Sequence, residues 1–345
     1  MSYPCLKINL KGIEKNCRLI NGRCTSSGIS VVGVSKCLLG DTRITEIFKK
    51  CGIDILGDSR LENLQKLRFH FGISQELILL RTPMISEAGN VVSVCQTSTN
   101  TQIETVMALS EAALRAGRVH GIIIMVETDD RREGILPGQV LPFCRQVLEN
   151  CPGVVISGLG TNARCISEKH PEPGSIKMLL DLKEEIEREL PVKIGIISGG
   201  NSSSLGLVFN NLMPEGVNQI RIGEAILLGH ETAEYKPIEG ACTDAFVLEA
   251  EVIEVKKNNE SVSGIIAALG IQDCGYQNIE CMDPGLKTIN QSSDHTVIAA
   301  ADNVISEDES ALNKFKTGDI ITFKLNYFGI LASMTSPFVK KQYLV

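Results

Sequence analysis

The chain has 345 residues, of which 43% are hydrophobic, and it carries a formal net charge of −7. This length predicts a large domain of about 200–250 residues and a smaller one, with a core that needs no disulfides. Acidic and basic residues are interspersed, so the charge pattern predicts no nucleic-acid partner. The longest apolar runs, such as Gly121–Val126, are too short to span a bilayer, and no membrane partner is expected.

The 12 cysteines do not have the spacing of metal ligands, since no Cys-x-x-Cys motif and no Cys/His cluster occurs. The sequence therefore predicts no metal site. Cys5, Cys95 and Cys165 lie in strand-like runs, where cysteine behaves as a small hydrophobic residue. Because Met1–Lys7 does not resemble a signal sequence, we expect reduced thiols and a cytoplasmic location.

Short apolar runs alternate with longer amphipathic segments over the first two thirds of the chain. The predicted strands are Val31–Val34, Ile53–Leu56, Leu77–Leu80, Val91–Cys95, Ile122–Val126, Val154–Gly158, Lys193–Ile197 and Gln219–Ile222. Most are apolar throughout, which is typical of parallel strands that are covered on both faces. Such an alternation suits a (β/α)8 barrel or a doubly wound sheet, and the count of eight favours the TIM-like barrel.

Several predicted helices carry start or stop signals. Capping boxes at Ser59-x-x-Glu62 and Thr101-x-x-Glu104 predict the helices Leu61–Phe69 and Gln102–Ala116. Asp41 is the predicted N-cap of Thr42–Lys50, and Glu172–Leu190 should end at Pro191.

The pattern changes after Pro237, where helical periodicity is lost. The predicted strands there are Ala245–Val255, Gly264–Leu269, Thr296–Ala300 and Asp319–Leu325, separated by turn-rich segments such as Lys257–Glu260. Leu6, Ile8 and Leu10 alternate with polar residues and predict one strand before the first helix. We therefore predict an α/β protein: an N-terminal strand (1–10) that joins a C-terminal all-β domain (238–345), and a barrel at 11–237.

Catalytic groups of such barrels lie at the C-terminal ends of the strands, and phosphate sites favour the last two loops. Lys36 follows the first strand, where partial desolvation would lower its pKa and suit a Schiff base; the alternative is a solvent-exposed strand-end lysine. The loop Ser198–Ser204 offers glycines and hydroxyls that suit a phosphate, although an ordinary capped loop has the same composition. The last strand runs into Arg221-Ile222-Gly223-Glu224. All three segments would meet at one barrel mouth.

Together these residues resemble the fold-type III pyridoxal-5′-phosphate (PLP) enzymes, the alanine racemase group. Val126–Gly134 resembles the segment after the fifth strand, with Arg132 at the arginine position. Gly158–Asn162 resembles the segment after the sixth strand, with Asn162 where alanine racemases have histidine. The resemblance covers nearly the whole chain and is closest to the ornithine racemase branch. That narrower match rests on Ile197–Ser204, Arg221–Gly229, Gln272-Asp273-Cys274 and Ser292–His295.

The resemblance implies PLP as the cofactor and a role for each matching residue. Lys36 would form the internal aldimine and act as one proton-transfer base. Arg221 would donate to the pyridine nitrogen, which would then stay unprotonated because arginine is never neutral. The remaining cofactor residues are Ser202, Ser203, Gly223 and Glu224 at the phosphate, Ser198, Gly200 and Asn201 in the same loop, and Asn162 at the ring face. Arg132 would bind the phenolic oxygen of the cofactor or the substrate carboxylate. The alternatives are a solvated charged loop for Arg132 and an ordinary loop amide for Asn162.

The second base departs from the family pattern. Alanine racemases take it from a Gly-Tyr-x-Asp-Gly motif of the partner subunit, but here the stretch reads Gly270-Ile271-Gln272-Asp273-Cys274, and Ile271 cannot accept a proton. The candidates are Cys274, Asp273 and His295, followed by Tyr276. Their alternatives are a buried thiol, a turn residue and a packed histidine. For substrate binding we expect Ser293 and Arg132, with Asp294 favoured over Asp130 and Asp244 to meet a terminal ammonium.

The sequence thus predicts a PLP-dependent amino-acid racemase (an isomerase) that interconverts L- and D-ornithine or a similar basic amino acid. It would be a homodimer with shared active sites, because the partner subunit lends the second base. Three alternatives stay open: a non-catalytic PLP-binding homeostasis protein, whose known relatives lack a β-domain; a PLP-dependent D-amino-acid lyase or aldolase, which would need a metal; and a barrel scaffold with a structural lysine.

Overall fold

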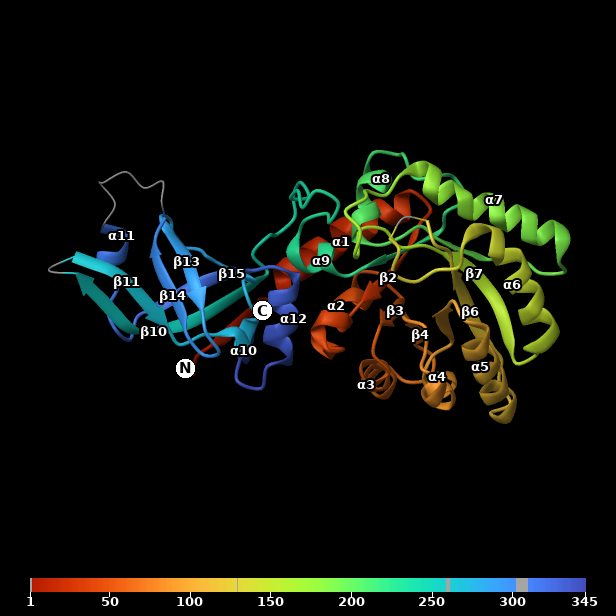
Figure 1. Ribbon diagram of the computed structural model, residues 1–345, viewed down its shortest axis with the longest axis horizontal. Coiled ribbons are helices and arrows are strands. Elements are labelled where there is room, and N and C mark those ends of the chain that lie inside the picture. The colour runs from red at the N-terminus through yellow and green to blue at the C-terminus, as the bar shows by residue number, and fades with distance from the viewer. Residues whose placement is uncertain (1, 129, 259–260, 302–309) are drawn as a thin grey trace. The chain divides into compact units, whose positions relative to one another are not determined.

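The computed structural model describes residues 2–128, 130–258, 261–301 and 310–345. The chain divides into two compact units, each with its own core (Figure 1). We call residues 14–36 and 40–241 the barrel unit, and residues 1–13, 37–39 and 242–345 the β-unit.

The barrel unit is built on a closed barrel of parallel strands that follow one another in chain order. The strands are β2 (Ser30–Val34), β3 (Ile55–Asp58), β4 (Glu76–Leu79), β5 (Thr97–Asn100), β6 (His120–Met125), β7 (Val154–Gly160), β8 (Ile196–Ser198) and β9 (Gln219–Ile222). The barrel closes where β9 pairs with β2, with Arg221 opposite Val32. The predicted (β/α)8 barrel is therefore confirmed.

One of the eight predicted strands is wrong. Val91–Cys95 lies mostly in helix α4 (Ala88–Val94), and Cys95 ends that helix. The strand at this position is β5, whose sequence Thr-Ser-Thr-Asn is buried throughout. A short apolar run fits a buried strand as well as a buried helical turn, so hydrophobicity favoured the wrong segment. Cys165 likewise lies in an exposed loop and not in a strand.

The helices that alternate with the strands cover the outside of the barrel (Figure 1). They are α1 (Leu10–Ser26), α2 (Thr42–Lys50), α3 (Leu61–Phe71), α4, α5 (Ile103–Arg115), α6 (Pro137–Asn150), α7 (Pro173–Glu189), α8 (Leu205–Phe209) and α9 (Glu224–Leu228), with short 3-10 turns η1 (Lys36–Leu38), η2 (Ile85–Glu87) and η3 (Ser202–Ser204). The predicted N-cap of α2 is confirmed, because Asp41 Oδ1 accepts hydrogen bonds from the N–H groups of Arg43 and Ile44.

Both predicted capping boxes are wrong. The N-caps of α3 and α5 are Arg60 and Gln102, and neither side chain caps its helix. Each helix begins one residue later than the motif requires, so Ser59 and Thr101 lie before the cap position. Near α3, the carboxylate of Asp58 accepts the N–H of Arg60 instead.

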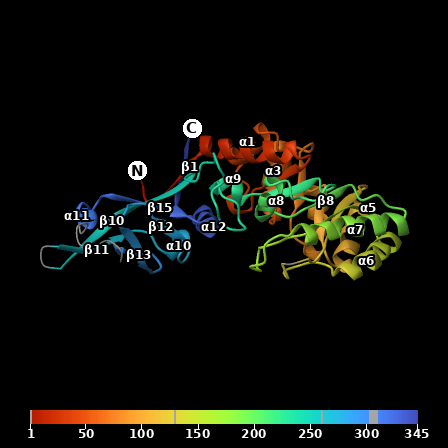
Figure 2. The same ribbon diagram turned by 90° about the horizontal axis from the view of Figure 1, so that it is seen from above.

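The β-unit is a mostly antiparallel sheet in which β10 (Phe246–Asn258) pairs with β1, β11 and β15 (Figures 1 and 2). The other strands are β1 (Cys5–Asn9), β11 (Ser261–Ala267), β12 (Ile279–Cys281), β13 (Leu286–Gln291), β14 (Thr296–Ala300), β15 (Ile320–Leu325) and β16 (Lys340–Leu344), and the short helices are α10 (Ile271–Cys274), α11 (Ser310–Asn313) and α12 (Tyr327–Thr335). The predicted C-terminal β-domain is confirmed, with these helices as additions. Lys257 lies in β10 and not in a turn; residues 259–260 are outside the described ranges.

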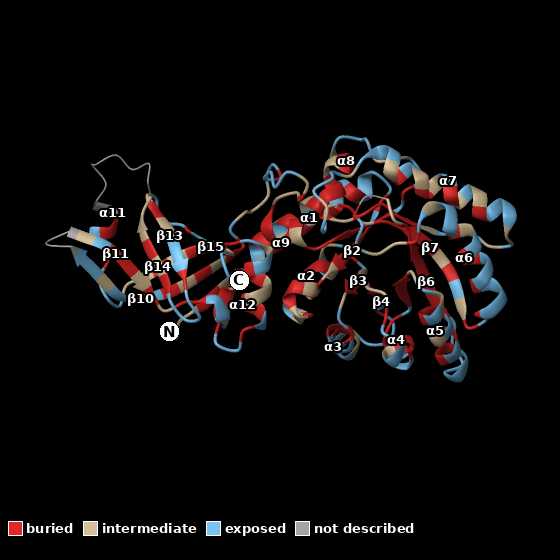
Figure 3. Ribbon diagram, in the orientation of Figure 1, coloured by how far each residue is buried: buried red, intermediate tan, exposed pale blue. Residues whose placement is uncertain are grey.

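Burial follows the two architectures (Figure 3). The barrel strands are buried over most of their length, while the surrounding helices bury one face and expose the other. In the β-unit, inward residues of β10 and β15 such as Leu248 and Phe323 are fully buried. None of the helices in the described ranges has the length and apolarity that a bilayer crossing requires.

Candidate functional site

Arg221 is the central polar group of the barrel mouth. It lies on β9, only 6% of the residue is exposed, and its Nη1 donates to Ser198 Oγ at the end of β8 at 2.5 Å. Its Nη2 donates to the carbonyl of Thr161 at 2.5 Å and to Asn162 Oδ1 at 2.7 Å, both just after β7. Burial lowers the pKa of Arg221 to about 10, so the guanidinium remains a cation at neutral pH. The predicted residues Ser198, Asn162 and Arg221 therefore form one hydrogen-bonded group.

The glycine–serine loop after β8 has the backbone that a phosphate site needs. Gly200 has a φ of +114°, and a Cβ at this position would collide with Ser204 Oγ. The Asn201 side chain accepts the N–H of Ser203 at 2.8 Å and so caps η3. Ser202 Oγ accepts the N–H of Ala225 at 3.3 Å, which joins this loop to the start of α9.

The N-cap of α9 is Gly223, and the hydrogen bond from Ala225 to Ser202 places the loop that contains Ser202 and Ser203 beside the start of this helix. Ser204 Oγ is buried and has no hydrogen-bond partner among the described residues. An unpaired buried hydroxyl beside a glycine with positive φ and two helix starts suits an oxygen-rich anion. The residues present thus fit the phosphate of PLP.

Lys36 begins η1, two residues after the last residue of β2, and is half-buried. The preceding residue, Ser35, donates its hydroxyl to Asp58 Oδ2 at 2.7 Å. Asp58 is fully buried at the end of β3 and also accepts from Asn63 Nδ2 at 3.1 Å; burial raises the pKa of its carboxyl group. Asp58 was missed from the sequence because its partners come from two separate segments.

The thiol of Cys165 is influenced by three predicted site residues that carry a positive charge. Burial of the sulfur raises the pKa of this thiol, although the residue as a whole is exposed. The charge of Asp130 acts in the same direction, and the charges of Arg132, Lys36 and Arg221 act in the opposite direction. Asn201 Nδ2 lies 3.3 Å from Cys165 Sγ. The predicted cations that follow the first, fifth and eighth barrel strands therefore all act electrostatically on this one thiol. From hydrophobicity alone, Cys165 was expected to be a packed thiol. Its position at the barrel mouth follows from the geometry of the loop.

Arg132 lies in the loop after β6 and is held by carboxylates. Its Nε and Nη2 donate to the two oxygens of Glu133 at 2.9 and 2.7 Å, and its Nε lies 4.0 Å from Asp130 Oδ2. Asp129, in the same predicted segment, is outside the described residues.

The residues predicted to supply the second base lie together in the β-unit. The N–H groups of Ile271 and Gln272 donate to the carbonyls of Ser292 and Ser293 at 2.9 and 3.1 Å, so α10 is joined to the turn between β13 and β14. A Cβ on Gly270 would collide with the backbone of Asp294. Within this unit, Asp273, Cys274, Ser293, Asp294 and His295 therefore share one region, which we call the α10 corner.

The candidate bases of the α10 corner differ in exposure. Cys274 is fully buried, its Sγ lies 3.4 Å from the carbonyl of Gly270, and burial raises the pKa of its thiol to about 12. Asp273 is buried and accepts the N–H of Gly270 at 2.9 Å. His295 is different, because about half of its side chain is exposed (47%) and its Nδ1 lies 2.8 Å from Asp294 Oδ1. Tyr276 is also exposed.

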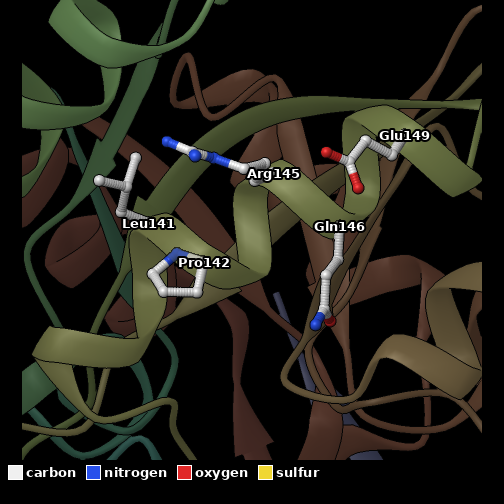
Figure 4. A pocket seen from close by; sticks show the side chains of 5 residues that line it. All are labelled: Leu141, Pro142, Arg145, Gln146 and Glu149. Atoms are coloured by element: carbon white, nitrogen blue, oxygen red, sulfur yellow. The ribbon is translucent and has the colours of Figure 1, made fainter.

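Two surface hollows lie away from the predicted site residues. One is lined by Leu141, Pro142, Arg145, Gln146 and Glu149, all from α6 (Figure 4). Another is lined by residues such as Ile29 and Asn218, which precede β2 and β9 at the N-terminal edge of the barrel. Neither contains a predicted site residue, and barrels carry their chemistry at the opposite edge. In the ranges that the structure describes, no three His, Cys, Asp or Glu side chains are grouped to hold a metal ion.

Comparisons with known proteins found relatives that cover both units. The family described as alanine racemase, N-terminal domain, matches residues 8–231. A lysine racemase of Thermotoga maritima is 35% identical, and the alignment covers 99% of this chain and 99% of the relative. An ornithine racemase of Acetoanaerobium sticklandii is 30% identical over 99% of this chain and its own full length (100%).

Solved structures are similar over the same length. A D-threo-3-hydroxyaspartate dehydratase from Delftia sp. HT23 superposes with a TM-score of 0.78 over 97% of this chain and 93% of that chain, at 14% identity. At this identity the likeness concerns the fold alone.

Proposed function

The chain belongs to the alanine racemase N-terminal domain family of PLP-dependent enzymes, and from this premise we propose that it interconverts the L- and D-forms of ornithine or a similar basic amino acid. The predicted family, the enzyme class and the cofactor are confirmed by the match. The substrate is our proposal. Its support is that both curated relatives are racemases named for amino acids with a terminal ammonium.

The observation that carries the proposal is the bonding of Arg221. A buried guanidinium that joins Ser198, Thr161 and Asn162 is held in one orientation, and its charge cannot be removed at neutral pH. A fixed cation at this point suits the ring nitrogen of PLP. It would keep that nitrogen unprotonated and so favour proton exchange over side reactions.

The other residues of the mouth have separate tasks. When bound, PLP withdraws electrons from the α-carbon of an amino acid and makes its α-proton removable. Lys36 would hold the cofactor and move the proton on one face. Ser202, Ser203, Gly223 and Glu224 would hold the phosphate, together with Ser198, Gly200 and Asn201. Asn162 would lie against the ring, and Arg132 would bind the substrate. Ser293, which belongs to the α10 corner and not to the mouth, is the other residue proposed to bind the substrate.

For the second base we propose His295, oriented by Asp294. An imidazole whose Nδ1 meets a carboxylate has a fixed ring and presents Nε2 as the proton acceptor. Cys274 is a poor choice, because a buried thiol with a pKa of about 12 is protonated at neutral pH. Asp273 is engaged with the backbone of its own helix. Asp294 would then orient His295, which weakens its candidacy as the partner of a substrate ammonium.

We further propose a cytoplasmic homodimer in which a second copy supplies His295. The departure of Ile271 from the family tyrosine supports a base of different chemistry at this position. All 12 cysteines are present as thiols and not as disulfides, which supports a reducing location.

The test is a visible absorption spectrum of the purified protein with PLP, for wild type and Lys36→Ala, followed by chiral analysis after incubation with L-ornithine or L-lysine. We expect a band that the variant lacks, and formation of the D-amino acid by wild type alone. A band without racemisation of either substrate would contradict the proposed reaction. An unchanged band in Lys36→Ala would contradict the role of the lysine.

A further inference from the structure

Asp130 joins two loops of the barrel mouth. Only 3% of the residue is exposed, and its Oδ1 accepts the N–H groups of Cys165, Ile166 and Ser167 at 2.8, 3.0 and 3.4 Å. Asp130 follows β6, whereas these three residues follow β7. One carboxylate oxygen therefore fixes the loop that continues from Asn162.

The other oxygen of Asp130 is used differently. Oδ2 is buried and has no hydrogen-bond partner among the described residues, and its nearest cation is Arg132, whose Nε lies 4.0 Å away. A buried carboxylate that lacks compensation is costly. The charge of Asp130 is thus balanced mainly by the three N–H dipoles and by Arg132.

Arg132 is also held by Glu133, which occupies one edge of the guanidinium. Glu133 takes the Nε–Nη2 side. The N–H groups that point to the other edge, those of Nη1 and the second one of Nη2, have no partner within the described part of the chain. That edge has the fork geometry that binds a carboxylate with two parallel hydrogen bonds. Two carboxylates therefore determine which edge of Arg132 is offered to a ligand.

We propose that Asp130 is a positioning residue that fixes Arg132 so that this second edge binds the α-carboxylate of the amino acid. The inference rests on the proposed function, in which Arg132 binds the substrate, and what it adds is the role of Asp130. It also couples substrate binding to the loop that carries Asn162, because Asp130 holds both segments.

A purely structural role for Asp130 is separable from a positioning role. In Asp130→Asn the side-chain oxygen can still accept the N–H groups of Cys165 and Ile166, but the negative charge near Arg132 is lost. In Asp130→Ala both functions are lost. A matched carboxylate-to-amide control is Glu149→Gln, on the outer face of α6.

The experiment compares wild type, Asp130→Asn, Arg132→Ala and the double variant in kcat, KM, the Kd for PLP and the melting temperature of the ligand-free protein. We expect Asp130→Asn to raise KM about tenfold, with kcat within about threefold and the other two quantities unchanged. In the Arg132→Ala background the same change should alter KM less than about twofold, because its partner is absent. Glu149→Gln should match wild type.

Equal effects in both backgrounds, or a lower melting temperature of Asp130→Asn with an unchanged KM, would overturn the proposal. Titration of the visible band with L-ornithine gives a dissociation constant without turnover. A wild type that binds but does not racemise would overturn the proposed function, while a weaker Kd of Asp130→Asn would still support this inference. A band that responds to no basic amino acid would overturn both.

Discussion

The barrel mouth and the α10 corner hold their polar residues in opposite ways. At the mouth, Arg221, Asp58 and Asp130 are buried, and each is bonded to residues from separate segments. At the α10 corner, the backbone is tightly joined, but the polar pair His295 and Asp294 is about half exposed and bonded mainly within its own turn. A cofactor cradle must resist movement, whereas a group that exchanges protons must reach its substrate and solvent. The contrast therefore fits the proposed division between residues that hold the cofactor and residues that transfer protons.

The largest effect on stability is expected when Arg221, the central residue of the barrel mouth, is removed. Arg221→Leu leaves Ser198, Thr161 and Asn162 without their donor, and we expect a loss of roughly 5 kcal/mol in the free energy of unfolding, since each unsatisfied buried group costs about 1–3 kcal/mol. Urea denaturation measures it. A loss below about 1 kcal/mol would mean that the mouth is not rigidly held.

Removal of the exposed imidazole should affect chemistry and not folding. We expect His295→Gln to lower racemisation about 10³-fold, which corresponds to about 4 kcal/mol in the barrier, because general acid–base catalysis contributes about 10²–10⁴-fold. Lys36 should still exchange the α-proton of one enantiomer with deuterated solvent. Mass spectrometry of each enantiomer shows this asymmetry. Equal loss of exchange for both enantiomers would contradict a role on one face.

The pH dependence of stability tests whether a polar residue at the N-terminal edge of the barrel, His120, is also buried. His120 begins β6, it is buried against Ser98, and burial lowers its pKa to about 4. Folding therefore favours the neutral imidazole: its contribution is complete above the unfolded pKa of 6.5 and is lost as the pH falls from 6.5 to about 4. We expect wild type to lose roughly 3 kcal/mol more than His120→Gln between pH 7.5 and 4. Parallel curves would show that His120 does not titrate this way.

The smallest effect is expected for the buried thiol. Cys274→Ala should leave kcat within about threefold of wild type and lower stability by about 1 kcal/mol, as for a small buried side chain. Kinetics and thermal unfolding on the same preparation check both. A loss of activity comparable to that of His295→Gln would identify Cys274, and not His295, as the second base.

Much of the fold was predictable because seven barrel strands overlap mostly apolar runs that alternate with amphipathic helices. The exception, β5, shows the limit: its Thr, Ser and Asn side chains are buried by tertiary packing, which composition along the chain does not reveal. The predicted strand was instead the neighbouring valine-rich segment, which forms α4.

The candidate site was predictable where a short motif carries the chemistry, as in the glycine–serine loop and Arg221. The residues that hold these groups in place through hydrogen bonds were not predictable. Thr161 meets Arg221 through a carbonyl that any residue could provide, and Asp58 meets Ser35 from 23 positions away. Such contacts depend on the strand order and not on the identity of neighbouring residues.

The twelve cysteines are distributed very unevenly in accessibility, and this has a practical use. Cys165 is exposed, Cys51 and Cys242 are half-buried, and the others are buried. A bulky alkylating reagent should therefore modify Cys165 first. Since this thiol lies beside Asn201 and among the cations of the barrel mouth, its labelling rate can serve as a probe of ligand occupancy that needs no assay for a product.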